Sequence, residues 1–364
     1  MESLLILVAL LALIVSAVLA FPVRWLILRL GGIDRPNERS SHEAPTPRGG
    51  GLAIVLGTAL VVAWFGVPGR EAMVFGLCVA AVAAVSLVDD FRSLSFATRL
   101  VVQVGAAAVA IVGLDLPVGT IDMPSAAVRV PHVAGLVLAV AFVVAYSNFF
   151  NFMDGINGIA ACQASLSALT LGLLLWQGGD APGAVVAAAI GGAAAGFLPH
   201  NFPTARIFMG DVGSVTLGFA LALLSMIAHE RAGVPGPALL LVHGAFLFDA
   251  VFTLLKRAVR GENVLRPHRE HNYQLLVRGG MSHRATTLIY FAMSAGCCLA
   301  GSLYGQAGTE GRWAALLVPL VALAILAVMA HRRGPAGPVV AVALGVQSGD
   351  PRDPAPQAAG EAGQ

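Results

Sequence analysis

The sequence predicts an all-α, polytopic integral membrane protein. Of its 364 residues, 57% are hydrophobic and only 12% are charged, whereas soluble domains carry about 25% charged residues. The mean hydropathy is +0.81, and long apolar runs recur from end to end. A chain of this composition cannot cover a water-exposed surface, which excludes a soluble enzyme, a nucleic-acid-binding protein and a disordered scaffold.

The apolar runs approach the ~20 residues that a helix needs to cross the hydrocarbon core. We therefore expect about eleven membrane spans, or ten if one short run does not cross. The expected ranges are 3–23, 49–66, 72–88, 97–113, 133–152, 156–176, 181–198, 212–228, 237–255, 285–305 and 313–330.

The basic residues predict the orientation. Arg24 and Arg29 follow the first span, so we interpret that span as an uncleaved helix with its N-terminus outside. With alternating sides, 18 of the 22 Lys and Arg residues then fall on the cytoplasmic side, as the positive-inside rule requires. We expect residues 1–333 to form one membrane domain in a bacterial inner membrane, with the active site facing the cytoplasm. The Gly-, Pro- and Ala-rich residues 334–364 are expected to be a disordered tail.

Most polar side chains lie at helix ends or in loops on the expected cytoplasmic side. Asp249 is the only acidic residue well inside an expected span. Transporters more often carry ionisable or helix-breaking residues near the midplane. This distribution favours an enzyme acting at the membrane surface, while a transporter of lipids or nucleotide sugars remains the alternative.

Three aspartates lie where apolar runs meet cytoplasmic loops. Asp89 and Asp90 end the third run, where two carboxylates repel each other unless a cation or a shared proton relieves them. Asp211 opens the eighth run within Gly-Asp-Val-Gly-Ser, which offers backbone N–H groups and a carboxylate to Mg²⁺ and phosphate. A solvated helix end and an ordinary N-cap are the simpler interpretations.

A run of amides marks the end of the fifth span. Asn148, Asn151 and Asp154 recur every third residue, so they lie near one helix face. Asn157 follows between two glycines, which permit close approach of the backbone to a ligand. A helix cap would explain one or two of these residues, but not the whole run.

Two basic loops complete the set of candidate sites. One contains Arg266, His268, Arg269 and His271. Zinc is disfavoured there because neighbouring arginines repel a cation, whereas Arg and His suit phosphate. The other loop ends in Pro-Arg-Gly-Gly-Gly at Arg48, and it could equally be a membrane anchor of the positive-inside type.

Together and in this order, the segments from Asp34 to Ser282 resemble the polyprenyl-phosphate N-acetylhexosamine-1-phosphate transferases, which include MraY and WecA. The most specific segment is Phe-Met-Gly-Asp-Val-Gly-Ser, residues 208–214. The resemblance implies transfer of a sugar-1-phosphate from a UDP-N-acetylhexosamine to undecaprenyl or another polyprenyl phosphate, with release of UMP and use of Mg²⁺ or Mn²⁺. The sequence leaves the oligomeric state open, with a homodimer as a possible assembly.

The resemblance also suggests roles for individual residues. Asp211 would be the metal ligand with Asp90 near the metal, and Asp89 would deprotonate or position the lipid phosphate. His271 would contact the diphosphate. The expected substrate contacts are Asn148, Asn151, Asp154, Asn157, Asn201, Phe208, Arg266, His268, Arg269 and Arg48.

Two departures from the common family pattern affect which UDP-sugar we expect as the donor. Asn157 stands where many members carry a second aspartate, and His271-Asn-Tyr-Gln replaces a His-x-His-His form. The late loop looks closest to the WbpL-type branch, which starts O-antigen chains. We therefore expect UDP-GlcNAc or a 6-deoxy relative such as UDP-FucNAc or UDP-QuiNAc. The loop from Arg266 to Gln274 is expected to read the sugar, with Tyr273 and Gln274 presenting a hydroxyl and an amide to the sugar or to neighbouring side chains.

Overall fold

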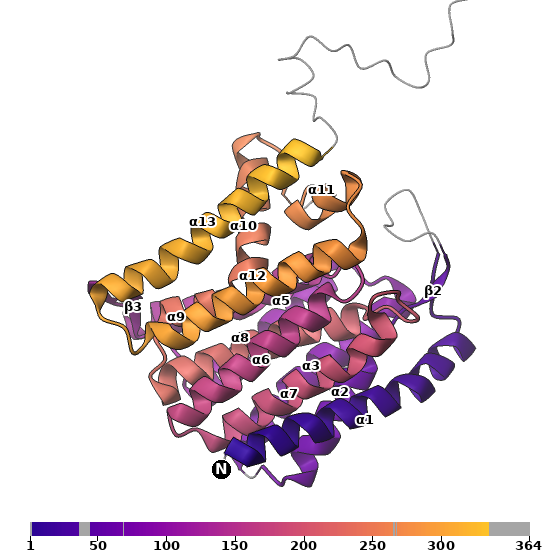
Figure 1. Cartoon of the computed structure of the whole chain (residues 1–364). Coiled ribbons are helices and arrows are strands. Elements are labelled where there is room, and N and C mark those ends of the chain that lie inside the picture. The colour runs from indigo at the N-terminus through magenta and orange to yellow at the C-terminus, as the bar shows by residue number, and fades with distance from the viewer. Residues whose placement is uncertain (1, 36–43, 68, 265, 267, 335–364) are drawn as a thin grey trace, which may run out of the picture.

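The computed structural model describes residues 2–35, 44–67, 69–264, 266 and 268–334. Helices dominate it, and most of them run along a common bundle axis (Figure 1). The helices are α1 Glu2–Arg29, α2 Gly51–Trp64, α3 Arg70–Arg92, α4 Phe96–Leu114, α5 His132–Phe152, α6 Ile159–Gln177, α7 Ala181–Asn201, α8 Asp211–Ala232, α9 Gly236–Val242, α10 Gly244–Val259, α11 Asn272–Arg278, α12 His283–Tyr304 and α13 Thr309–Arg333. The expected tail lies outside the described residues, apart from Gly334.

The polytopic helical prediction is confirmed, although the count of eleven spans is not. Within the described ranges, nine helices are long and apolar enough to cross a membrane. The helix α2 is apolar but has only 14 residues. The pair α9 and α10 would add a tenth span, but it is bent by 88°, so the straight helix expected over 237–255 is wrong.

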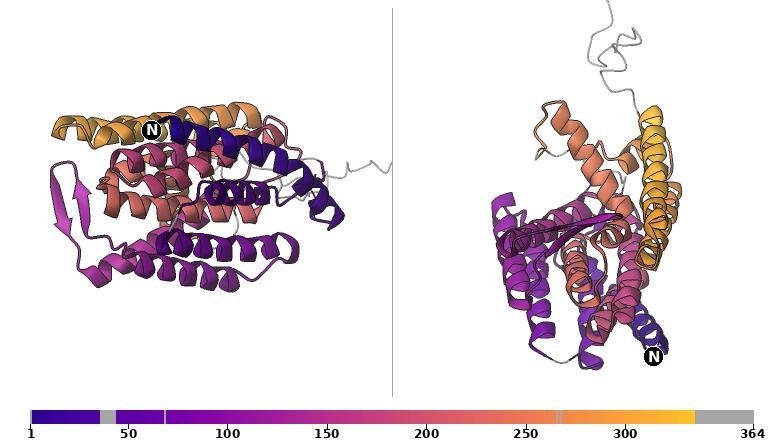
Figure 2. Two further views of the ribbon diagram at one scale, coloured as in Figure 1. Left: turned by 90° about the horizontal axis from the view of Figure 1, so that it is seen from below. Right: turned by 90° about the vertical axis from the view of Figure 1, so that its left-hand side faces the viewer.

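Buried polar side chains stabilise the bend between α9 and α10. The helix break at Val242 leaves its carbonyl without the usual backbone partner. Ser167 Oγ donates to this oxygen at 2.9 Å and Gln163 Nε2 at 3.3 Å. Both donors come from α6, and Gln163 also accepts a hydrogen bond from Ser294 of α12. These bonds connect the break to α6 and α12 at the point where α10 leaves the bundle (Figure 2).

The helix α8 forms the centre of the bundle. Of its apolar window, 94% is buried, against 22% for α1, α3 and α13 at the periphery. Glycines permit the closest helix contacts. A Cβ on Gly192 or Gly196 of α7 would lie 2.0 or 2.1 Å from a carbonyl oxygen of α1, so these small residues, four apart, let the two backbones touch.

Two short antiparallel strand pairs lie at opposite ends of the bundle. The strands β1 Ile33–Asp34 and β2 Thr46–Pro47 pair beside the C-terminus of α1. The strands β3 Thr120–Met123 and β4 Ala126–Arg129 form a hairpin that follows the C-terminus of α4. The predicted functional residues gather at the end that carries β1 and β2.

Candidate active site

Three aspartates meet at one end of the bundle, and two arginines lie between them. Arg48 Nε is 2.9 Å from Asp90 Oδ1, and its Nη2 is 2.5 Å from Asp211 Oδ1. Arg99 Nη1 is 2.8 Å from Asp89 Oδ2 and 3.1 Å from Asp211 Oδ2. The guanidinium groups thus relieve the repulsion that the sequence predicts between neighbouring carboxylates.

Asp90 stabilises the start of α8. Its two oxygens accept the backbone N–H groups of Asp211 at 2.8 Å and Val212 at 3.0 Å. The side chain of Asp90 is fully buried, whereas that of Arg48 is 38% exposed. A carboxylate at a helix N-terminus satisfies unpaired donors and interacts favourably with the helix dipole. Asp90 therefore fixes the backbone from which Asp211 projects.

A backbone contact brings Arg48 to this cluster. Phe208 N donates to the Pro47 carbonyl at 2.8 Å, and the Phe208 carbonyl accepts from Gly50 N at 2.8 Å. The two loops join here as a parallel bridge. Gly210 has φ +75°, and a Cβ there would lie 2.6 Å from Asp90 Oδ2, so only glycine fits between the loop and the carboxylate.

The amide run surrounds the same site. Asn151 Oδ1 accepts from Ser214 Oγ at 2.9 Å, which joins the end of α5 to the start of α8. Asn201 accepts from Gly158 N at 2.7 Å and donates to the Ile207 carbonyl at 2.9 Å. Asn157 donates to the Pro203 carbonyl at 3.1 Å. These bonds hold the loops that follow α5 and α7 against each other.

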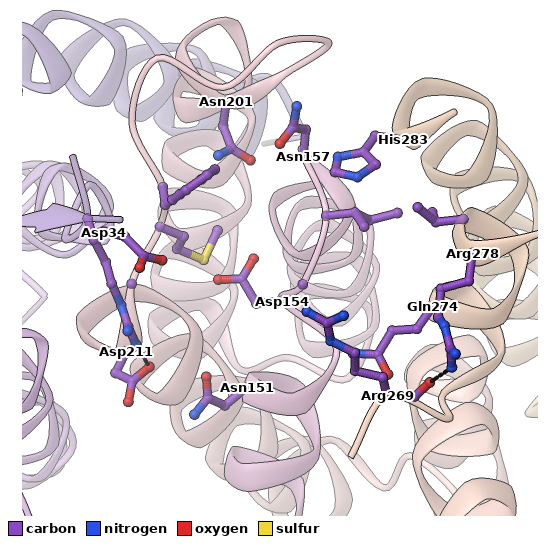
Figure 3. Close-up of a pocket in the computed structure, with 17 residues that line it drawn as sticks. Asp34, Asn151, Asp154, Asn157, Asn201, Asp211, Arg269, Gln274, Arg278 and His283 are labelled. Atoms are coloured by element: carbon purple, nitrogen blue, oxygen red, sulfur yellow. Dashed lines mark hydrogen bonds and ion pairs between the residues drawn. The ribbon is translucent and has the colours of Figure 1, made fainter. Parts of the chain in front are cut away.

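A cavity of about 390 Å³ lies within these loops. Figure 3 shows Asp34 and Asp211 on one side, Arg269, Gln274 and Arg278 on the other, and Asp154 between them. The predicted residues that line it are Arg48, Asn151, Asp154, Asn157, Asn201, Phe208, Asp211 and Arg269. The further lining residues are Asp34, Gly155, Ile156, Met209, Gly210, Gln274, Val277, Arg278 and His283.

The late loop is held by Asp249. This buried carboxylate accepts the backbone N–H groups of Asn272 at 2.9 Å and Tyr273 at 3.2 Å. It also lies 3.3 Å from His271 Nδ1 and accepts a hydrogen bond from Tyr290. Asp249 therefore fixes the start of α11, as Asp90 does for α8.

Tyr273 and Gln274 differ in position, although they are adjacent in the late loop. Tyr273 is 1% exposed, and its hydroxyl donates to the Phe152 carbonyl at 3.0 Å. A Cβ on Gly155 would lie 2.0 Å from that hydroxyl. Tyr273 thus packs α11 against the amide run, whereas Gln274 lines the cavity. The sequence left the sugar and neighbouring groups open as partners; in the structure the Tyr273 hydroxyl bonds a neighbouring carbonyl.

Other predicted residues lie outside the cavity lining. Asn148 donates to Gln103 Oε1 at 2.7 Å and so joins α5 to α4. His271 is 3% exposed and lies beneath the loop, with its ring 4.9 Å from that of His268. Arg266 is exposed. Asp89 and Asp90 do not line the cavity. Asp90 pairs with the lining residue Arg48, and Asp89 pairs with Arg99, which in turn pairs with the lining residue Asp211.

The surroundings change the proton affinity of several loop residues. Enclosure raises the pKa of Asp154 well above its ordinary value; Arg48 opposes this rise, and Asp211 adds to it. Burial lowers the pKa of His268 to about 4, with further contributions from His271 and Arg257. His268 is therefore neutral at pH 7, and the positive charge on this side of the cavity comes from arginine.

The sequence analysis missed four polar residues at this site. Arg99 was counted only among the basic residues that set the orientation, and Asp34 only as part of a loop. Arg278 and His283 carried no motif. Their positions in α4, α11 and α12 relative to Asp211 depend on helix packing, and local spacing gives no signal for it.

The donor set of the site is compatible with Mg²⁺. Across the described part of the chain, no three His, Cys, Asp or Glu side chains converge as a ready-made metal site. However, Mg²⁺ commonly binds through one or two carboxylates, water and substrate phosphates. Asp211 lines the cavity, and its carboxylate pairs with the guanidinium groups of Arg48 and Arg99. Asp90 as a second ligand stays a prediction, because its oxygens already accept two backbone N–H groups.

The fold and site together define a membrane-embedded enzyme of phosphate chemistry, in which carboxylates and guanidinium groups meet at one end of a helical bundle. Comparison with known sequences identifies the family. Residues 72–229 match the model of Glycosyl transferase family 4. The chain belongs to this family, and the MraY- and WecA-like resemblance is confirmed.

Three relatives illustrate the similarity. The decaprenyl-phosphate N-acetylglucosaminephosphotransferase of Mycobacterium tuberculosis is 33% identical over 323 residues, with 78% of each chain covered. The probable undecaprenyl-phosphate N-acetylglucosaminyl 1-phosphate transferase of Bacillus subtilis is 28% identical over 276 residues, covering 74% of this chain and 76% of the relative. The undecaprenyl-phosphate alpha-N-acetylglucosaminyl 1-phosphate transferase of Salmonella typhimurium is 26% identical over 278 residues, covering 74% and 75%. These relatives do not single out the WbpL-type branch.

Proposed function

We propose that the protein transfers N-acetylglucosamine-1-phosphate from UDP-N-acetylglucosamine to a polyprenyl phosphate and releases UMP. The observation that carries this proposal is the cluster of Asp89, Asp90 and Asp211 with Arg48 and Arg99 at the wall of a cavity whose far side is basic. Relatives named for this reaction support it. UDP-FucNAc and UDP-QuiNAc are the alternative donors.

In this reaction an oxygen of the lipid phosphate forms a bond to the β-phosphorus of the UDP-sugar. The bond from that phosphorus to the bridging oxygen breaks, and the electron pair leaves with UMP. The second pKa of a phosphate monoester is about 6, so the acceptor is mostly a dianion at pH 7. The main barrier is therefore repulsion between anions, and we assign Asp89 to positioning, through Arg99, more than to proton removal.

The residues of the chain supply the required positive charge. In the structure, Arg48 and Arg99 both pair with Asp211. An incoming phosphate can replace a carboxylate oxygen as the partner of either guanidinium group without leaving that group unpaired. Arg269 and Arg278, across the cavity, can meet the diphosphate from the opposite side.

A metal would complete the screening. We propose Asp211 as the residue that holds Mg²⁺, with the Asn151 amide oxygen and water as further donors. When bound, the ion would withdraw charge from the phosphate oxygens. Asp90 would act indirectly by fixing the backbone of Asp211.

We place the site on the cytoplasmic side of a bacterial inner membrane, where UDP-sugars are made. The excess of Lys and Arg on the loops at this end supports that orientation. The lipid product would start a cell-envelope polysaccharide, with an O-antigen as one possibility. A homodimer remains a prediction.

A direct assay separates the enzyme from a transporter that uses the same loops for binding. Purified protein is incubated in liposomes with UDP-GlcNAc, with or without polyprenyl phosphate. The proposed enzyme releases UMP only when the lipid phosphate is present. Uptake of intact UDP-GlcNAc without UMP release would instead support the transporter.

A further inference from the structure

A second polar pocket lies at the end of the bundle opposite the candidate active site. The pocket adjoins the C-termini of α4, α8 and α12. The candidate active site adjoins the N-termini of the same three helices, so the two cavities lie at opposite ends of the bundle. The pocket has a volume of about 740 Å³. The β3–β4 hairpin forms one wall, and the turn between α12 and α13 forms another (Figure 1). If the helices span the bilayer, this pocket opens in the opposite leaflet.

Two donors at this pocket have no acceptor within the described chain. They are the hydroxyl of Tyr304 and Nε of Arg312, both buried from solvent. Tyr304 is 1% exposed, and the Arg312 guanidinium lies 5.6 Å from the centre of its ring. A buried unmatched donor costs about 1–3 kcal/mol. Since Arg312 lines the pocket, a ligand that carries negative charge, such as a phosphate ester, would complement its guanidinium group.

An apolar groove of about 500 Å³ lies between α12 and α13. Leu303, Ala307 and Gly311 line the groove, and their neighbours Tyr304 and Arg312 line the pocket. The groove is open at Gly296, where a Cβ would meet no heavy atom within 4 Å. The polar pocket and the apolar groove therefore approach each other at the turn between α12 and α13, where Leu303 is followed by Tyr304 and Gly311 by Arg312.

The pocket also carries negative charge. Asp122 and Glu230 line it together with Arg312. A ligand that suits the whole surface has a phosphate for Arg312, an ammonium group for the carboxylates and a hydrocarbon chain for the groove. We propose that this surface binds one phospholipid with a zwitterionic amine headgroup, such as phosphatidylethanolamine, from the leaflet opposite the candidate active site.

Native mass spectrometry of the purified full chain tests this proposal. The protein is equilibrated with vesicles of equal parts phosphatidylethanolamine and phosphatidylglycerol, and then transferred into mild detergent. We expect the wild type to retain one phosphatidylethanolamine per chain in preference to phosphatidylglycerol. Arg312→Gln removes the charge, and Gly296→Leu fills the groove. Each should lower this occupancy roughly tenfold.

Two control variants make the comparison specific. Arg129→Gln removes an exposed arginine from the neighbouring strand β4, and Gly105→Leu adds the same side chain to α4, where a Cβ also meets no heavy atom within 4 Å. Both controls should retain the lipid as the wild type does. The proposal is wrong if the wild type retains no phospholipid, if it holds phosphatidylglycerol equally well, or if the test and control variants lose lipid to the same extent.

Discussion

Asp90 accepts the backbone N–H of Asp211 at 2.8 Å, although the two residues are 121 positions apart in the chain. This bond connects the end of α3 to the start of α8. It gives Asp90 a positioning function and leaves the Asp211 side chain directed toward the cavity. The two aspartates should therefore respond differently to the same substitution.

Asp211→Asn should abolish turnover. The substitution removes the proposed metal ligand and the partner of two arginines, so we expect a loss of at least about 100-fold, corresponding to several kcal/mol of charge stabilisation. Chelation of the wild type should have the same effect, with recovery on adding Mg²⁺ or Mn²⁺. The control is Asp180→Asn, since Asp180 caps α7 through Gly183 N at 3.0 Å at the far end of the bundle. Full activity in chelator would exclude the metal.

Asp90→Asn should act mainly through structure. An amide can accept only one of the two backbone N–H groups well, and loss of a cap costs about 1–2 kcal/mol. We expect a lower Tm and a lower kcat, while the Mg²⁺ concentration for half-maximal activity changes by less than about threefold. If Asp90 is itself a metal ligand, that concentration should rise tenfold or more instead.

Asp154 should affect the pH dependence of donor binding. Because enclosure raises its pKa, Asp154 has a neutral form at pH values at which an ordinary aspartate is ionised. As the pH rises through this raised pKa, a new anion forms beside the diphosphate, so the KM for UDP-GlcNAc should rise. Asp154→Asn should bind the donor with a flatter pH profile. Identical profiles for the variant and the wild type would contradict this assignment.

Tyr273 and Gln274 should differ in their effect on sugar choice. Tyr273→Phe removes the hydrogen bond to the Phe152 carbonyl, so it should destabilise the loop by about 1 kcal/mol. It should lower kcat/KM by the same factor for every UDP-sugar. Gln274→Ala changes the cavity wall, so it should alter the ratio of kcat/KM between UDP-GlcNAc and UDP-FucNAc. A changed ratio for Tyr273→Phe alone would reverse these assignments.

Thiol labelling tests the orientation of the bundle. In a background without the four native cysteines, we expect Val264→Cys to react with an impermeant reagent only in inverted vesicles. Ser125→Cys, in the β3–β4 turn at the other end, should react in intact cells. The reverse pattern would place the candidate site outside the cytoplasm.

Much of the site could be predicted because its residues lie in short motifs next to apolar runs. Asp89, Asp90 and Asp211 meet in the structure, as the family resemblance implied. Arg99 was missed because its distance to Asp211 depends on how α4 packs beside α8. The neutrality of His268 was also missed, since burial and nearby cations determine it.

In the fold, too, local sequence predicted the helices, whereas features that depend on packing between helices were missed. Apolar length was enough to predict ten of the eleven expected segments as helices, including the short α2. It could not predict the bend at Val242, because the donors that stabilise the break, Ser167 and Gln163, belong to another helix. Likewise, apolar length gave no signal for the β3–β4 hairpin, which belongs to a connection between spans.

The central claim is that a phosphosugar, and not the sugar alone, moves to the lipid. The most direct measurement uses UDP-GlcNAc labelled at the β-phosphorus, with decaprenyl or undecaprenyl phosphate and the purified chain. We predict that the label enters the lipid fraction in equal amount to the UMP released, and that Asp211→Asn abolishes both. If the label stays in water-soluble UDP while the sugar reaches the lipid, or if no label enters the lipid, the proposed reaction is contradicted.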